Sequence, residues 1–275
     1  ITTIPSSMFK DCSALEQVTA RGIITAIGKE AFRSDKVLTE IPDLGQVTSI
    51  EERAFNGCSA LETVDLHSVT TMGYGAFEDC DALSGEIDLS NLEVIPGHAF
   101  CYDPNITSVI TCSTLSSIGD WAFIWAGIST ISLPETLNSI GSYTFYLASL
   151  SGTVTLPDSL TQLGASAFSG CETIEAIQIG SGLKDIPADA FADCTNLKKI
   201  TVNNRQEDVH IPQIAGVTVT YTIPSLTADN DKVSTAADAL SLQEAVNQAA
   251  SNGTSVTIEK DIRLDGPVTI AADQQ

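Results

Sequence analysis

The sequence predicts an α/β repeat solenoid, in which nine coils of about 23 residues stack into a rod. The nine phenylalanines of the 275-residue chain recur at intervals of 22 or 23 residues, an aliphatic side chain or Met precedes each by five residues, and alanine stands directly before seven of them. One such coil cannot bury its apolar side, so neighbouring coils must stack. The phenylalanines are Phe9, Phe32, Phe55, Phe77, Phe100, Phe123, Phe145, Phe168 and Phe191.

Each coil is expected to hold a short strand, a turn, one short helical or 3₁₀ turn and a return segment. After the Phe, apolar residues alternate at the end of a short run, as in Leu61-x-x-Val64-x-Leu66. This alternation is typical of a strand with one buried face. The Ile-Gly-x-x-Ala-Phe segment is too short for a full helix and suits a single helical turn. The phenylalanines would then form a ladder through a shared core.

Most cysteines occupy one position of the coil, three residues after the Phe. We interpret a cysteine at a fixed coil position as a small buried apolar side chain. The cysteines of coils three and four, and those of coils eight and nine, would lie on adjacent coils, so a disulfide in either pair stays open. Cys101 and Cys112 lie outside this position. The cysteines within it are Cys12, Cys58, Cys80, Cys171 and Cys194.

The repeat pattern resembles a known family. The period and the Leu-x-x-Val-x-Leu strand core are similar to leucine-rich repeats. The Ile-Gly-x-x-Ala-Phe-x-x-Cys-x-x-Leu portion is more specific, and it resembles the BspA-like subfamily of bacterial surface leucine-rich repeats over residues 1–204. This resemblance implies a secreted or surface-held binding module that adheres to host extracellular proteins or to other cells. Ile1 already lies on the repeat pattern, so we expect either that a signal peptide has been removed or that the chain has been shortened at this end.

Residues 205–275 are expected to form a linker and a small α+β segment. A short strand is predicted around VTVTY, and SLQEAVNQAASNG places apolar side chains on one helical face before Gly253 ends the helix. Short strands are predicted at 256–258, 262–264 and 268–270. This order resembles the cap that opens a pectin-lyase-like parallel β-helix. The resemblance implies an alternative function, the targeting arm of a truncated extracellular carbohydrate-active enzyme of the β-helix lyase type.

Charge and motif spacing exclude several classes of function. The net charge of −22 argues against nucleic acid as a partner, because phosphate recognition needs a basic face. The chain has no run of about 18 apolar residues, so membrane insertion is not expected. His67, His98 and His210 lie far apart without zinc-site spacing, and no nucleophile-elbow or phosphate-loop motif occurs. We therefore expect no catalytic residue, no cofactor and no metal ligand.

The outward face of the strands is the first candidate surface for a protein or glycan ligand on a host or neighbouring cell. Its side chains change from acidic in the first coils to hydroxylated in the middle coils, and the last coil carries Lys198 and Lys199. The alternative is a solvated β face that is rich in Thr for its strand propensity. The acidic candidates are Glu16, Glu40, Glu62, Asp65, Glu86 and Asp88.

A group of aromatic side chains is the second candidate surface. Five of the seven Trp and Tyr residues lie within two positions of a Phe in three adjacent coils. Stacking would gather them into a patch, and exposed aromatic patches mark sugar or protein contacts. The alternative is that they fill core space left by the missing cysteines. We predict that at least two are more than a third exposed. They are Tyr102, Trp121, Trp125, Tyr143 and Tyr146.

Overall fold

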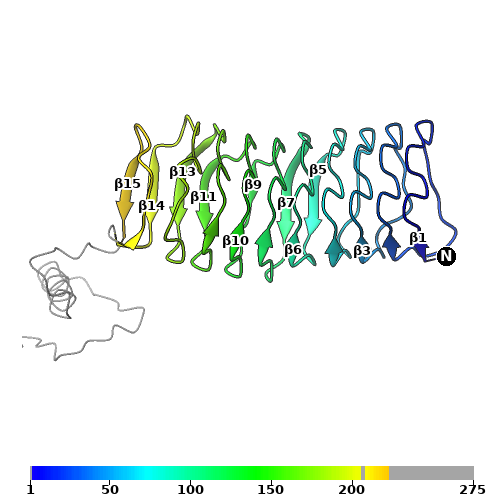
Figure 1. The fold of residues 1–275 in the computed structure, drawn as a ribbon, viewed down its shortest axis with the longest axis horizontal. Coiled ribbons are helices and arrows are strands. Elements are labelled where there is room, and N and C mark those ends of the chain that lie inside the picture. Colours follow the sequence, from blue (N-terminus) through cyan, green and yellow to red (C-terminus); the bar gives the residue numbers. More distant parts are fainter. Residues whose placement is uncertain (1, 206–207, 223–275) are drawn as a thin grey trace, which may run out of the picture.

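The structure is a computed structural model that describes residues 2–205 and 208–222. These residues form a rod of stacked coils, which runs from the blue N-terminal coil to the yellow coil that holds β15 (Figure 1). The nine Phe-bearing coils are followed by one further turn, so the predicted repeat solenoid is confirmed. Stacked strands lie about 4.8 Å apart, which accounts for the elongated shape.

Two rows of parallel strands build the solenoid. The first row holds two-residue strands that end five residues before each of the first eight phenylalanines and form the sheets β1-β2-β3-β4 and β6-β8-β10-β12. Their bounds are Thr3–Ile4 (β1), Ala26–Ile27 (β2), Ser49–Ile50 (β3), Thr71–Met72 (β4), Val94–Ile95 (β6), Ser117–Ile118 (β8), Ser139–Ile140 (β10) and Gln162–Leu163 (β12).

The second row comes from the apolar run after each Phe and forms the sheets β5-β7-β9 and β11-β13-β14-β15. In the first three coils this run gives only a bridge between Gln17 and Glu40, so the strand predicted at Leu61–Leu66 is not formed. Leu61 and Leu66 are nevertheless buried. The alternation of apolar residues in the sequence thus predicted which side chains are buried, but not which backbone groups form strand hydrogen bonds. The strands are Gly85–Leu89 (β5), Ile106–Thr111 (β7), Thr130–Ile131 (β9), Gly152–Leu156 (β11), Ile174–Ile179 (β13), Lys199–Val202 (β14) and Thr218–Tyr221 (β15).

The predicted helical turns, and with them the α/β class, are wrong for the described residues, whose named elements are all strands. The backbone around each Phe alternates in hand: His98 has φ +57° and Tyr102 has φ +65°. Alternate N–H groups therefore leave the coil, as where Phe9 donates to Ala31 O of the next coil at 2.8 Å. A helix keeps all such bonds within one segment. In this segment the stacking of coils directs about half of the N–H groups to the next coil, so the bonds of a helical turn do not form.

The predicted phenylalanine ladder is confirmed. Neighbouring rings stack with centroids 5.0–5.9 Å apart along all nine positions. Phe32 to Phe191 are buried, whereas Phe9 in the first coil is only partly buried. The backbones approach closely beside this ladder: a Cβ on Gly164 would lie 2.2 Å from the Ser142 nitrogen, so glycine is required four residues before Phe168.

All seven cysteines are free thiols, so neither disulfide alternative is present. Four of the five at the shared position are buried, as we predicted, and each donates from sulfur to the Phe carbonyl of the preceding coil, as Cys58 does to Phe32 O at 3.0 Å. Cys12 is exposed instead. It belongs to the first coil, which has no preceding coil among the described residues to cover it.

The last described turn continues the solenoid. The strand predicted around VTVTY is confirmed as β15, which pairs in parallel with β14 through Val202 and Tyr221. The division at residue 204 stays a prediction, and the helix and three strands predicted after residue 240 lie outside the described residues. In the part of the chain that the structure describes, no helix has the length and apolar character that a membrane crossing requires.

Candidate functional site

Side chains two positions before and one position after each Phe form rows along one side of the solenoid, which we call the turn face. It is charged in the first four coils and aromatic in the next three. Left-handed backbone recurs two positions before the Phe in most coils, so the spacing between side chains repeats from coil to coil. The turn face comprises Lys10, Glu30, Arg33, Arg53, Asn56, Glu78, His98, Cys101, Trp121, Tyr143 and Tyr146.

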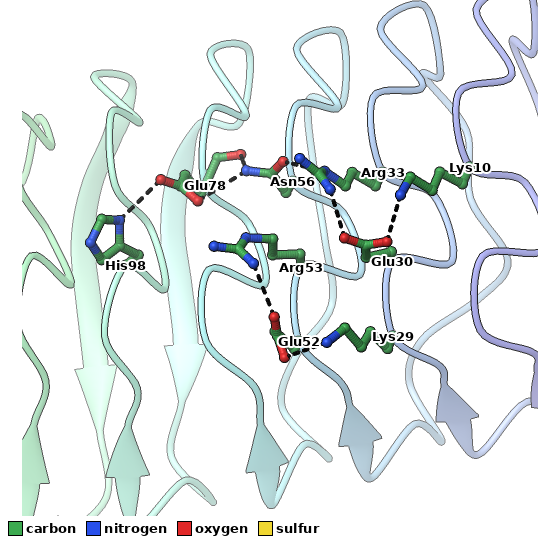
Figure 2. Close-up of polar contacts among 9 residues, drawn as sticks. All are labelled: Lys10, Lys29, Glu30, Arg33, Glu52, Arg53, Asn56, Glu78 and His98. Atoms are coloured by element: carbon green, nitrogen blue, oxygen red, sulfur yellow. Dashed lines mark hydrogen bonds and ion pairs between the residues drawn. The ribbon is translucent and has the colours of Figure 1, made fainter.

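A continuous polar network crosses the first five coils on the turn face (Figure 2). Glu30 accepts from Lys10 at 2.7 Å and from Arg33 at 2.6 Å. Arg33 also donates to Asn56 at 3.3 Å, and Asn56 donates to Glu78 at 3.0 Å. The network ends where Glu78 Oε1 meets His98 Nδ1 at 3.0 Å.

The network orders side chains more than it stabilises the fold. The hydrogen bond from Lys10, aided by Arg33, holds the pKa of the Glu30 carboxyl below its ordinary value. A shorter second row lies beside it, in which Glu52 meets Lys29 at 2.8 Å and Arg53 at 3.0 Å. Exposed pairs of this kind contribute little to stability, because solvent screens the attraction between their charges. Their main effect is a fixed pattern of charge.

Aromatic rings replace the charges in the fifth to seventh coils, and Tyr74 of the fourth coil lies beside them. Tyr74 lies 4.7 Å from His98, which stacks on Trp121 at 5.6 Å between ring centroids. Trp121 meets Tyr143 at 5.0 Å, and Tyr143 meets Tyr146 edge-on at 5.6 Å. Sequence reasoning placed the last three together but missed Tyr74 and His98. The available signal was that His98 stands two residues before its Phe, as Trp121 and Tyr143 do.

Tyr102 and Trp125 form a separate aromatic pair two positions after their Phe residues. Their rings meet edge-on at 6.3 Å, and their exposed fractions are 39% and 55%. The prediction that at least two of the five aromatic residues are more than a third exposed is therefore confirmed. Trp121, Tyr143 and Tyr146 are half-buried. Beside Trp125 lies an open hollow of about 320 Å³, lined by Pro104, Trp125, Ala126, Gly127, Leu147 and Ser149.

The acidic candidates lie along the strand face and do not converge on one point. Glu86 of β5 pairs in register with Ser108 of β7, which pairs with Thr130 of β9. Further along, Thr153 pairs with Ala176, and Ala176 with Lys199. The change from acid through hydroxyl to base thus follows the strand face. Asp88 is half-buried, whereas the other acidic candidates are exposed: Glu16, Glu40, Glu62, Asp65 and Glu86.

Two aspartates that sequence reasoning missed lie in the core. Asp35 and Asp103 occupy the position three residues after the Phe, where most coils have Cys, and both are fully buried. One oxygen of each accepts a backbone hydrogen bond, from Cys12 at 2.7 Å and from Cys80 at 2.8 Å. The second oxygen of each has no partner. Burial raises the pKa of Asp35 to about 6 and raises the pKa of Asp103 well above its ordinary value.

A thiol, an imidazole and a carboxylate meet at the boundary between the charged and aromatic parts of the turn face. The donor atoms of Glu78, His98 and Cys101 lie within 4.8 Å of one another. These groups resemble the parts of a nucleophilic triad. Cys101 is fully buried, however, and burial raises the pKa of its thiol, so no substrate can reach a reactive thiolate there. The arrangement does not support nucleophilic catalysis.

A family model described as "BspA type Leucine rich repeat region" matches residues 2–126 and 116–213, in six copies. The chain belongs to this family. As a BspA-type chain it is a repeat module of a kind that binds other proteins over an extended surface. The suggested resemblance is therefore confirmed. The curated proteins give no match.

Solved structures show the same fold as this BspA-type chain. A leucine-rich repeat protein from Bacteroides ovatus is 22% identical with TM-score 0.61, and the match covers 83% of this chain and 68% of that one. A leucine rich cell surface protein from Faecalibacterium prausnitzii is 19% identical with TM-score 0.50, covering 81% and 83%. The pneumococcal vaccine antigen PcpA is 20% identical with TM-score 0.54, covering 81% and 66%. At these identities the likeness concerns the fold.

Proposed function

We propose that this BspA-type chain is a non-catalytic binding module, secreted or held at a bacterial cell surface, that adheres to host extracellular proteins or to other cells. The observation that carries the proposal is the exposed pair Tyr102 and Trp125 beside the hollow. Large aromatic side chains next to a hollow are the usual centre of a protein-binding site, because they contribute most of the binding energy.

The backbone supports this pair rigidly. The Tyr102 N–H donates to Ile124 O of the next coil, and the Trp125 N–H donates to Tyr146 O, both at 2.9 Å. Both residues have left-handed backbone that these bonds hold in place. A preformed site loses little conformational entropy when a partner binds. Leu147, 37% exposed, adds an apolar wall to the hollow.

The charge of the molecule favours a protein partner with a basic surface. The net charge is −22, and the six acidic candidates on the strand face lie in the first four coils. Opposite charges accelerate association and orient the partner, and added salt weakens both effects. We therefore assign the aromatic pair the role of anchor and the acidic strand face that of steering. A glycan is the other ligand that an aromatic pair accommodates, and the experiment separates the two.

The test compares variants of the two exposed aromatic residues with a variant of one exposed apolar residue on the strand face. Trp125→Ala and Tyr102→Ala remove the anchor, whereas Ile110→Ala removes a side chain on the strand face that is 40% exposed. Binding is measured to immobilised matrix proteins, to whole cells and to a glycan array. We expect Trp125→Ala to lower affinity for a matrix protein at least about tenfold, with Ile110→Ala unchanged.

Three results would count against this proposal. The first is that the wild-type chain binds neither matrix proteins nor cells. The second is that Ile110→Ala loses as much affinity as Trp125→Ala, which would place the contact on the strand face. The third is binding to glycans alone with loss on Trp125→Ala, which would make the pair a sugar platform. The enzyme-arm alternative rests on residues 223–275, outside the described residues, and the described solenoid holds no observation that favours it.

A further inference from the structure

We propose that Glu78, His98 and Cys101 bind a divalent transition-metal ion of the class to which Zn²⁺ belongs. A carboxylate oxygen, an imidazole nitrogen and a thiol sulfur lie within 4.8 Å of one another. Thiolate, imidazole and carboxylate are the ligands that zinc takes in proteins. Mg²⁺ and Ca²⁺ prefer oxygen ligands alone, so the donor set disfavours them.

The spacing of the donors fits one ion. Glu78 Oε1 and His98 Nδ1 are 3.0 Å apart, and an oxygen and a nitrogen on one tetrahedral zinc ion lie about 3.3 Å apart. The sulfur would lie about 3.6 Å from either, so the cluster closes with a shift of about 1 Å. Glu78 follows the Phe of the fourth coil, and His98 and Cys101 flank that of the fifth. The ion would therefore link two coils.

Neighbouring side chains already orient two of the donors. Asn56 donates to Glu78 Oε2 at 3.0 Å, which turns Oε1 toward His98 (Figure 2). The His98 ring is held between Tyr74 and Trp121, at 4.7 and 5.6 Å between centroids. Such outer contacts fix ligand geometry and sustain metal affinity. The aromatic contacts of His98 thus acquire a role besides packing.

The cluster offers both access and shielding. The side chains of His98 and Glu78 are 21% and 17% exposed, whereas Cys101 is fully buried. An ion would reach the site from the solvent side, keep water as its fourth ligand and be shielded behind by the core. The nearby Glu78 and Asp79 carboxylates add to burial in raising the pKa of the Cys101 thiol. The same negative surroundings attract a cation.

Binding follows a defined proton balance. The Cys101 S–H bond breaks, its proton goes to the solvent, and the sulfur electron pair forms the bond to the metal. In the neutral imidazole, the proton that His98 Nδ1 shares with Glu78 moves to Nε2, so that Nδ1 presents its lone pair. One proton leaves per ion bound. Affinity should therefore fall about tenfold for each pH unit by which the solution is acidified.

The experiment titrates the whole 275-residue chain, reduced and stripped of metal, with Co²⁺ and then with Zn²⁺. We expect one Co²⁺ per chain with a thiolate-to-cobalt charge-transfer band, which disappears when Zn²⁺ displaces the cobalt. Cys101→Ser should abolish the band, and Glu78→Gln and His98→Gln should weaken Zn²⁺ binding at least about tenfold. Zn²⁺ should raise the Tm of the wild type by more than it raises that of Glu78→Gln at the same Zn²⁺ concentration.

Two matched controls isolate the cluster. Cys112→Ser replaces another buried thiol, which bonds to Leu92 O at 3.1 Å, and His67→Gln replaces an exposed histidine that pairs with Asp65. Both should keep the ion and the band. If Cys101→Ser fails to fold, Glu78→Gln decides, because it preserves the size of the side chain and keeps an oxygen that accepts from Asn56. The proposal is overturned if the folded wild type binds no ion, if Cys101→Ser keeps the band, or if a control loses it.

Discussion

Asp35 and Asp103 show how one substitution in a repeat changes the chemistry of a core. Each replaces the thiol that other coils place three residues after the Phe, and each leaves one carboxyl oxygen buried without a partner. An unpaired buried carboxylate is costly, so its neutral form is favoured. The pKa of Asp35 is therefore raised to about 6 by burial. For such a group the native state binds the proton more tightly than the unfolded state does.

The pH dependence of stability follows from this sign. Between the ordinary pKa near 3.8 and the native pKa of about 6, the native state holds more protons, so stability falls as pH rises through this window. Above pH 6 the full cost is present. We expect Asp35→Asn to raise the free energy of unfolding at pH 7 by about 1 kcal/mol and to lose this advantage by pH 4. Urea denaturation at both pH values measures it.

A suitable control for this experiment is Asp81→Asn, which changes an exposed aspartate of the fourth coil. It should leave the free energy of unfolding nearly unchanged at both pH values. Asp35→Asn keeps the oxygen that accepts from the Cys12 N–H, so the comparison isolates the charge. Two results would contradict the raised pKa of Asp35. One is that Asp35→Asn is less stable than the wild type at pH 7, and the other is that its gain in stability is as large at pH 4 as at pH 7.

At the scale of the element, the segment around each Phe is stabilised by its neighbours and not by itself. Its N–H groups alternate between a partner in the same turn and a carbonyl of the next coil, as Met8 bonds to Pro5 and Phe9 to Ala31. The ring at the centre of the segment stacks on rings above and below. Burial of one Phe side chain contributes about 1.5–3 kcal/mol, so each rung depends on having both neighbours.

Replacing a central rung should therefore cost more than replacing the terminal one. Phe100→Ala removes a fully buried ring between Phe77 and Phe123, and we expect it to lower the free energy of unfolding by about 3–5 kcal/mol. Phe9→Ala removes a partly buried ring that stacks on Phe32 alone and should cost clearly less. Chemical denaturation of the two variants gives the comparison. Equal losses of stability would show that the contribution of a Phe ring does not depend on how many neighbouring rings it contacts.

The whole molecule behaves as a one-dimensional array with different surfaces along its length. Each coil contacts the coils next to it, and stability in such arrays is close to a sum of coil and interface terms. The turn face changes from charged to aromatic side chains. On the strand face, the acidic candidates of the first coils are followed by hydroxylated side chains and then by Lys198 and Lys199. A regular core thus carries surfaces whose side chains change from coil to coil. This arrangement suits a module that binds its partner over a large area.

Such an array should open from its ends before it opens in the middle. The Phe9 and Phe77 amides make the same kind of bond, to Ala31 O at 2.8 Å and to Ala99 O at 3.0 Å. Phe9 lies in the first coil, whereas Phe77 lies in the fourth. We expect native-state hydrogen exchange to be at least about tenfold faster at Phe9 than at Phe77. Identical rates for the two amides would indicate that the solenoid opens as one cooperative unit.

The repeat architecture was accessible from the sequence because its cause is periodic. The spacing of Phe55 and its equivalents, together with Ala54 before it and Cys58 after it, requires that each coil bury the same side chains against the next. That Tyr102 and Trp125 lie in one row was also predictable, because both stand at the same position relative to their Phe. Residues that share one register position lie in one row of the solenoid.

The tertiary structure alone decided how the turns are built and which polar side chains meet. A single coil gives no sign that Phe9 donates to Ala31 of the next one, and so local propensity predicts a helical turn where stacking imposes left-handed backbone. Glu78 and His98 are 20 residues apart and meet only because their coils are stacked. Sequence determines the period of this protein, whereas contacts between different positions of adjacent coils depend on backbone geometry that the period does not encode.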